Sequence, residues 1–235
     1  MDVCKTINID QETIDRWNIG IKNYPKFWLK SWYKLYEEKY LEKTPLRSYF
    51  KDMIGDKKEI KIADVGSGAL VQIGHYWDGV DVKIYPMDLS AKRYNDYYKK
   101  LGITPIILVE NQNIENIGYP DNTFDIVHCS NTLDHCCNPI KGIYELIRIC
   151  KIGGWIYLRH FNKSAFNQRF KTIHVWNIKF IPKLNDAIFY SGNKKTKFML
   201  NDLTEKMKSH FKSFYGVDWE GCTRAMIISK MRKWN

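Results

Sequence analysis

Two glycines between two acidic residues form the spacing in this sequence that most directly suggests ligand chemistry. Asp64 lies at the end of an apolar run, Gly66 and Gly68 follow it, and Asp88 ends a second apolar run about 20 residues later. Glycines allow a tight turn in which a ligand approaches the backbone, and a carboxylate accepts hydrogen bonds from both hydroxyl groups of a ribose. The spacing therefore predicts a nucleoside-binding turn between a strand and a helix, although structural turns also produce paired glycines.

Histidine and aspartate side chains later in the chain suggest acid–base chemistry. Asp134 and His135 follow one predicted strand, His160 directly follows another, and His174 lies in a later aromatic segment. A histidine near a carboxylate is suited to act as a general base. Adjacent side chains need not face each other, however, and a histidine on a helix face can simply be satisfied by the backbone. The three histidines lack the close spacing of a metal motif, so we expect no metal site.

Alternating strands and helices are expected to position these residues. The predicted strands are 60–65, 82–87, 105–109, 124–129 and 155–159, followed by a terminal antiparallel hairpin of 213–219 and 225–231. The predicted helices are 70–77, a helix capped by Ser90 and stopped by Gly102, a helix from Asn138-Pro139 to about 151 before Gly153-Gly154, and 201–210. This order predicts an α/β fold with a doubly wound, mostly parallel sheet of seven strands.

The remaining segments are expected to cover the site within one domain, 1–235. Residues 1–50 read as a helical cover, with Pro25 at a helix start and aromatic residues at 28, 32, 36 and 40 that form either a packing face or a lid. Residues 60–160 are the expected ligand-binding core, and 201–235 hold the last helix and the hairpin. The basic, aromatic segment 161–200 is expected to recognise the substrate and to contain a hairpin around 176–189.

Composition and charge narrow the class of protein. The hydrophobic content of 44% and the charged content of 27% are typical of a globular chain, and no apolar run is long enough for a membrane span. Six cysteines without a C-x-x-C pair and an N-terminus unlike a signal peptide predict a cytoplasmic protein with reduced thiols. Residues 151–235 contain 17 Lys/Arg against 5 Asp/Glu, which indicates either an anionic partner or a solvated basic surface.

Between residues 60 and 158 the sequence resembles the class I S-adenosylmethionine-dependent methyltransferases. The resemblance rests on Asp64-Val65-Gly66-Ser67-Gly68, on Asp88, and on the segments YPDNTFD at 119–125 and RICKIGG at 148–154. The terminal hairpin is similar to the last two strands of that family. This chain has Leu70 where the family carries a third glycine, and it has Asn113 where relatives usually carry an aspartate.

The resemblance implies S-adenosylmethionine as the cofactor and assigns roles to individual residues. Gly66 and Gly68 would lie under the methionine portion, Asp64 would position its amino group, Asp88 would hold the ribose, and Asn113 would meet the adenine. The full set of cofactor residues implied is Asp64, Gly66, Gly68, Asp88, Leu89, Asn113, Ile114 and Ser130.

The same resemblance extends to the residues expected to meet the methyl acceptor. NTLDH at 131–135 and HVWN at 174–177 look like a small bacterial branch of the family, parts of which are associated with surface-polysaccharide synthesis, such as capsule modification with O-methyl phosphoramidate. The catalytic candidates are His135, Asp134 and His160, and the acceptor-binding candidates are Asn131, Arg159, His174 and Trp176. Lys163 and Arg169 could also orient an anionic acceptor.

These features predict an O-methyltransferase that acts on a small anionic acceptor, as a monomer or a homodimer. Three alternatives stay open: an RNA or DNA methyltransferase that uses the basic segment, a subunit that binds the cofactor without catalysis, and a dinucleotide dehydrogenase. The dehydrogenase is disfavoured because its third glycine would fall at Val71, and a nucleic-acid substrate because no N-P-P-Y-type tetrad or known RNA-binding module is present.

Overall fold

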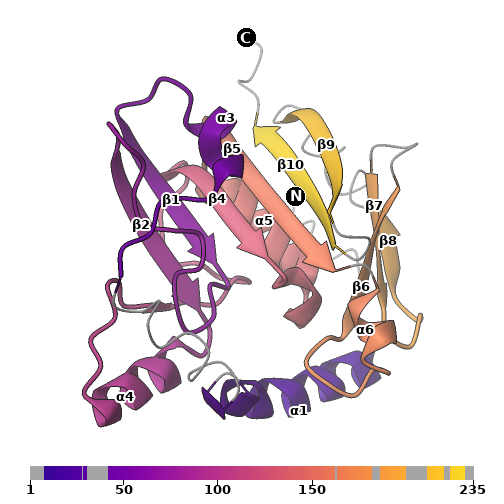
Figure 1. The fold of residues 1–235 in the computed structure, drawn as a ribbon. Coiled ribbons are helices and arrows are strands. Elements are labelled where there is room, and N and C mark those ends of the chain that lie inside the picture. The colour runs from indigo at the N-terminus through magenta and orange to yellow at the C-terminus, as the bar shows by residue number, and fades with distance from the viewer. Residues whose placement is uncertain are drawn as a thin grey trace.

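The computed structural model describes residues 8–27, 29–30, 42–161, 163–181, 186–199, 211–219 and 223–230. Its larger sheet has the strand order β3-β2-β1-β4-β5-β10-β9 (Figure 1). The strands are β1 (Glu59–Val65), β2 (Asp81–Asp88), β3 (Glu110–Asn111), β4 (Phe124–Ser130), β5 (Cys150–Phe161), β9 (Phe211–Trp219) and β10 (Thr223–Lys230). Strands β1 to β5 pair in parallel, whereas β10 pairs antiparallel with both β5 and β9. The parallel α/β sheet with an antiparallel terminal hairpin is thus confirmed.

Both faces of the sheet are covered by apolar side chains. On one face, α5 (Pro139–Ile149) packs through Ile143 and Leu146 against Val127 and other residues of the central strands. On the other face, η4 (Ser48–Phe50) and α3 (Lys51–Ile54) bury Phe50 against Ile62 of β1. Because β1 sits between β2 and β4, its carboxyl end lies at the middle of the parallel part of the sheet.

The predicted boundary residues of two helices lie where the sequence places them, although the Ser90 side chain makes no capping hydrogen bond to α4. Helix α4 (Ala91–Leu101) follows Ser90 and ends at Gly102, which adopts φ 68°, a left-handed conformation that favours glycine. Helix α5 follows Asn138, whose side-chain oxygen accepts hydrogen bonds from the backbone N–H groups of Ile140 and Lys141. Helix α5 ends at Ile149, earlier than predicted, and β5 begins directly after it.

Two predicted elements are wrong. Residues 70–77 form no helix, because their backbone hydrogen-bonds to the segment before η4: Leu46 N–H donates to Tyr76 O at 2.8 Å, and His75 N–H donates to Thr44 O at 2.7 Å. Residues 105–109 form no strand either. The edge strand β3 is only Glu110–Asn111, paired with the end of β2, while Leu108 is 58% exposed.

The N-terminal helix begins earlier than the sequence suggested. Helix α1 spans Gln11–Phe27 and contains Pro25 in its last turn, so Pro25 does not start a helix. In Figure 1, α1 runs across the carboxyl ends of the central strands. The predicted aromatic stripe at 28, 32, 36 and 40 and the predicted helix 201–210 lie outside the described residues.

The segment after β5 forms a small separate sheet. It follows α6 (Ser164–Asn167) and has the order β6-β7-β8, with β6 at Trp176–Ile181, β7 at Asp186–Ser191 and β8 at Lys197–Met199. The expected hairpin is therefore present, with a third strand added to it. Among the described residues, no helix is long and apolar enough to cross a membrane.

Candidate active site

A cavity opens at the carboxyl ends of β1, β2 and β4, where ligands bind in parallel α/β sheets. Its walls come from the turns after these strands and from one side of α1. The lining residues are Trp17, Ile21, Tyr24, Val65, Gly66, Asp88, Leu89, Ser90, Gln112, Asn113, Ile114, Glu115, Asn131, Thr132, His135, Cys136 and Ile173. Of the residues predicted to bind the cofactor, Gly66, Asp88, Leu89, Asn113 and Ile114 line this cavity. Asp64, Gly68 and Ser130 do not.

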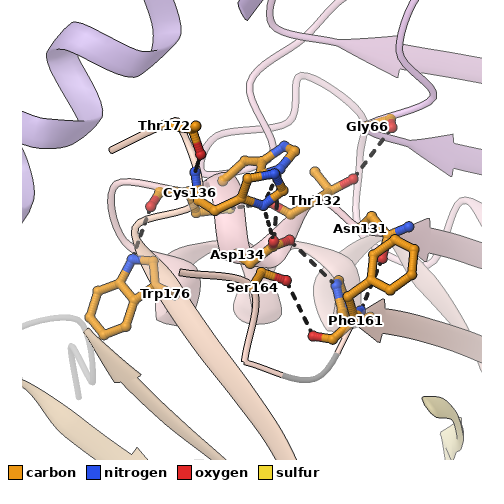
Figure 2. Close-up of polar contacts among 12 residues, drawn as sticks. Gly66, Asn131, Thr132, Asp134, Cys136, Phe161, Ser164, Thr172 and Trp176 are labelled. Atoms are coloured by element: carbon orange, nitrogen blue, oxygen red, sulfur yellow. Dashed lines mark hydrogen bonds and ion pairs between the residues drawn. The ribbon is translucent and has the colours of Figure 1, made fainter. Parts of the chain in front are cut away.

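The glycine turn after β1 is required by the packing of the protein itself. Gly66 and Gly68 have φ values of 75° and 72°, which L side chains rarely adopt. A Cβ atom at Gly66 would lie 2.0 Å from Oγ1 of Thr132. Thr132 itself donates a hydrogen bond to Gly66 O at 3.3 Å (Figure 2). The glycine thus makes room for Thr132, a partner that the local sequence does not reveal.

Asp88 closes this turn from the neighbouring strand. Its carboxylate accepts hydrogen bonds from Gly68 N–H at 3.1 Å and from Ser90 N–H at 2.7 Å, one on each oxygen. Each oxygen keeps a further lone pair for a ligand hydroxyl group. Burial raises the pKa of Asp88 to about 6, although the two backbone hydrogen bonds lower it.

The edge of the cavity near β3 carries the residues expected beside an adenine. Asn113 accepts a hydrogen bond from Glu115 N–H at 2.9 Å through its side-chain oxygen, which fixes the amide in a turn. Ile114 lies next to it on the cavity wall, and Leu89, 39% exposed, follows Asp88. The resemblance to the methyltransferases implied these three residues, and all three line the cavity.

Asp64 has a different partner from the one expected. Its carboxylate lies 2.7 Å from Nδ1 of His128, at hydrogen-bonding distance. His128 is the residue of β4 that pairs with Asp64 in the sheet. The other ring nitrogen of His128 contacts the hydroxyl group of Tyr49 at 3.2 Å, and Asp64 and His128 are both buried. The side chain of Asp64 therefore belongs to a buried Tyr49–His128–Asp64 chain, and its predicted role at the methionine amino group is not supported by this orientation.

Helix α1 forms the roof of the cavity. Trp17, Ile21 and Tyr24 lie on one helical face, and the indole N–H of Trp17 donates to His135 O at 2.7 Å. The ring of Tyr24 stands edge-on to that of His135, with centroids 5.0 Å apart. An N-terminal helix thus covers the cavity, with Trp17 and Tyr24 as its aromatic residues there, whereas the predicted stripe lies outside the described residues. The i, i+4, i+7 spacing of Trp17, Ile21 and Tyr24 was a signal that the sequence offered.

The predicted catalytic residues Asp134, His135 and His160 gather around one carboxylate, together with His174, which was predicted to bind the acceptor. His174 Nδ1 lies 2.6 Å from Asp134 Oδ2 and 3.0 Å from His135 Nε2. His160 Nδ1 lies 3.8 Å from the other oxygen, Asp134 Oδ1. Figure 2 shows Asp134 with dashed lines that start from its carboxylate. Asp134 is 1% exposed and His160 is 6% exposed, and only His135 of these four lines the cavity.

Burial and charge act in opposite directions in this cluster. Burial alone would raise the pKa of the Asp134 carboxyl group, but His135, His160 and His174 outweigh it and hold that pKa well below its usual value. Burial also lowers the pKa of His135 to about 4, against the attraction of Asp134. The cluster therefore holds a buried carboxylate beside a neutral imidazole at neutral pH.

The structure separates the residues predicted to bind the acceptor. Asn131 lines the cavity, and its side-chain oxygen accepts from Phe161 N–H at 3.1 Å. Arg159 does not line the cavity; its charge acts on Tyr49 and Tyr157 instead. Trp176 is fully buried, and its indole N–H donates to Cys136 O at 3.0 Å, so it is a core residue and not an acceptor contact.

The residues of the cavity fit a nucleoside-containing cofactor. A carboxylate with free lone pairs ends β2, a glycine without a Cβ atom follows β1 at the cavity wall, and an amide and an apolar side chain follow β3. In parallel α/β folds, a carboxylate in this place binds the ribose of such a ligand, and a glycine lets the ligand approach the backbone. The amide and the apolar side chain are suited to contact the base.

Comparisons with known proteins agree with this fit. Residues 63–158 match the family model of the methyltransferase domain. The probable methyltransferase ltbC of Aspergillus luteorubrus is 33% identical over 125 residues, covering 48% of this chain and 44% of that protein. The ubiquinone/menaquinone biosynthesis C-methyltransferase UbiE of Shewanella sediminis is 22% identical over 143 residues, covering 61% and 49%. The chain thus spans about half the length of these curated relatives or less.

A solved structure shows the same fold over more of the chain. The crystal structure of a putative S-adenosyl-L-methionine-dependent methyltransferase from Methanococcus maripaludis has a TM-score of 0.50 and 15% identity. It covers 91% of this chain and 93% of that chain. At this identity the likeness concerns the fold alone.

Proposed function

We propose, from the methyltransferase domain formed by residues 63–158 and its S-adenosylmethionine-type cavity, that this chain transfers a methyl group to an oxygen atom of a small anionic acceptor. The observation that carries the proposal is the position of Asp88, Asn113 and the glycine turn around one cavity at the carboxyl ends of the strands. When bound, S-adenosylmethionine supplies an electrophilic methyl group, so the protein mainly has to align and desolvate the reactants.

The residues at one end of the cavity would bind the cofactor, and those at the other end would bind the acceptor. Asp88 would hold the ribose, and Asn113 and Ile114 would contact the base. His135 lines the opposite part of the cavity, with Asp134 and His174 behind it, so this end would receive the acceptor. The roof formed by Trp17, with Ile21 and Tyr24, would exclude water from the reacting groups.

The charge of the C-terminal part supports an anionic acceptor. A hollow on the small sheet is lined by Lys163, Lys179, Lys194 and Lys197 together with Ile181, Ile188 and Tyr190. No acidic side chain lines it among the described residues. We propose a phosphorylated, phosphoramidate or nucleotide-linked sugar precursor of a bacterial surface glycan as the acceptor class. UbiE, by its name, methylates carbon, which makes a carbon acceptor the second candidate.

The proposal is tested first at the cofactor. Asp88→Ala should weaken S-adenosylmethionine binding by about tenfold to a hundredfold in calorimetry, because hydrogen bonds to a charged acceptor contribute about 1.5–3 kcal/mol. Asp96→Ala, an exposed aspartate of α4 paired with Lys92, is the matched control and should bind normally. Thermal unfolding of both variants detects any loss of the turn itself. Equal affinities in the folded variants would refute the assignment of Asp88.

The acceptor is then identified by turnover. Phosphorylated sugars, nucleotide sugars, phosphoramidates and RNA are incubated with S-adenosylmethionine, and mass spectrometry detects a methylated product. The carbon chemical shift of the new methyl group distinguishes an O-methyl from a C-methyl product. Cofactor binding without turnover of any acceptor would favour the non-catalytic alternative, and binding of NAD instead would overturn the class.

A further inference from the structure

Three side-chain atoms with lone pairs converge on one point beside the cavity. Asp134 Oδ2, His135 Nε2 and His174 Nδ1 are separated by 2.6, 3.0 and 3.8 Å, and all three lie within 4.8 Å of one another. Asp134 and His135 come from η5 (Leu133–His135), which follows β4, whereas His174 comes from the segment before β6. Two parts of the chain about 40 residues apart are therefore folded to bring these atoms together.

The side chains of this cluster carry too few protons to hydrogen-bond all of its close polar atoms. Nδ1 of His174 carries at most one hydrogen, so it cannot make full hydrogen bonds to both Asp134 and His135. In addition, Asp134 Oδ1 and both ring nitrogens of His160 are buried and have no hydrogen-bond partner among the described residues. These unpaired atoms show that the protons of this buried cluster do not satisfy it. Because Nδ1 of His174 faces two atoms and can serve only one of them, a group that accepts a lone pair from each of the three converging atoms fits between them.

We propose that Asp134, His135 and His174 bind one divalent ion of the first transition series. Two imidazole nitrogens and one carboxylate oxygen suit Zn²⁺, Fe²⁺, Co²⁺ or Mn²⁺, whereas Mg²⁺ and Ca²⁺ prefer oxygen ligands. Ligand atoms about 2.0–2.2 Å from such an ion lie roughly 3 Å apart, close to the separations found here. The unpartnered atoms of Asp134 and His160 face each other across 3.8 Å, so His160 is a positioning residue for the metal-binding carboxylate.

The location of this site relates it to the acceptor end of the cavity. His135 both contributes a ligand atom and lines the cavity, so the ion would lie at the wall that receives the acceptor. A divalent ion there would bind an acceptor oxygen and favour its deprotonated form. The metal site itself does not rest on methyl transfer, since the three ligand atoms converge whatever the cavity binds.

The test is a metal titration of the full chain without a histidine tag. Co²⁺ is the first probe, because its visible absorption reports nitrogen and oxygen ligation, and Zn²⁺ is titrated by calorimetry in parallel. We expect one ion per chain. His174→Ala and Asp134→Asn should each weaken binding by more than about tenfold. His75→Ala removes a histidine that contacts Thr44 outside the cluster and should bind the metal normally.

A separate measurement keeps this result apart from the proposed function. S-adenosylmethionine affinity is measured for the same variants, because a variant that still binds the cofactor is folded around the cavity. Loss of metal binding in such a variant supports the site. The inference is overturned if the folded wild-type chain binds neither ion, or if His174→Ala and Asp134→Asn bind it as tightly as His75→Ala. Failure of cofactor binding alone would instead count against the proposed function.

Discussion

Replacing Gly66 with alanine tests the packing of the glycine turn against Thr132. The new Cβ atom would lie 2.0 Å from Oγ1, 2.3 Å from Cγ2 and 2.6 Å from Cβ of Thr132. Rotation of the threonine side chain cannot relieve the overlap, because Cβ itself is too close. The substitution also places an L side chain at φ 75°. Two separate costs therefore act at one position.

The expected magnitude follows from these two costs. An L residue in the left-handed region costs about 1–2 kcal/mol, and overpacking of this kind costs about 1–3 kcal/mol. Gly66→Ala should thus lower the free energy of unfolding by roughly 2–5 kcal/mol. Gly102→Ala is the matched control, because Gly102 has φ 68° but nothing within 4 Å of the added Cβ atom. It should lose only the about 1–2 kcal/mol of backbone strain.

Urea unfolding of a double-mutant cycle separates the two costs. Thr132→Gly removes the overlapping atoms, so in that background Gly66→Ala should lower the free energy of unfolding by only about 1–2 kcal/mol. The two substitutions should therefore show a favourable coupling energy of about 1–3 kcal/mol. If Gly66→Ala and Gly102→Ala lost equal stability, or if the coupling were zero, the contact with Thr132 would be refuted. S-adenosylmethionine affinity of the double variant then reports whether the cofactor also needs the bare backbone at this position.

Three further predictions concern the roof, the buried histidine and the carboxylate of the cavity. Trp17→Phe removes the N–H group that donates to His135 O, so stopped-flow fluorescence should show faster cofactor release. Urea unfolding should show a loss of about 1 kcal/mol in the free energy of unfolding. Unchanged cofactor release would contradict the role of α1 as the roof of the cavity. Tyr49→Phe leaves Nε2 of His128 buried without its partner and should cost about 1–3 kcal/mol in urea unfolding, whereas no loss would contradict the contact. Cofactor affinity should rise about tenfold from pH 5 to pH 7, because the ionised form of Asp88, whose pKa is raised to about 6, accepts both ribose hydrogens. Calorimetry at several pH values checks this rise, and Asp88→Asn should remove it.

Local sequence signals predicted the parts of the fold that local interactions determine. Asn138-Pro139 caps α5 through the asparagine side chain, and Gly102 ends α4 in a left-handed conformation. Asp88 was placed by its distance from the glycines, and the structure positions it against Gly68 N–H. Each of these residues interacts with its own turn or with the end of the neighbouring strand. Spacing along the chain is therefore enough to predict its position.

The errors arose where distant segments decide the structure. Residues 70–77 could form helical hydrogen bonds, but they bond to the backbone of residues 44–47 instead. Asp64 has the spacing of a cofactor residue, yet His128 on the adjacent strand takes its carboxylate. Trp176 was predicted to contact the acceptor, yet its side chain is buried in the core. No single-sequence pattern encodes these pairings, because each joins residues about 30 or more positions apart.

The position of α1 has a consequence for the synthesis of the protein. Besides roofing the cavity, α1 and the residue before it contact the segment before β6 and the turn after β7. Arg16 of α1 donates to Phe170 O at 3.2 Å, and Asn193 donates to Asp10 at 2.7 Å. Gly20 lies so close to the backbone of Ile173 that a Cβ atom there would be 2.7 Å from Ile173 Cα. The helix is therefore made about 150 residues before the segments onto which it docks.

On the ribosome, this order leaves the apolar face of the first helix without its partners for some time. At about 5–20 residues per second, the roughly 150 residues in between take on the order of ten to thirty seconds. During that interval Trp17, Ile21 and Tyr24 are available to chaperones or to a neighbouring nascent chain. Slower translation through the central strands should therefore increase aggregation, and added chaperone at unchanged temperature should raise the yield of folded chain.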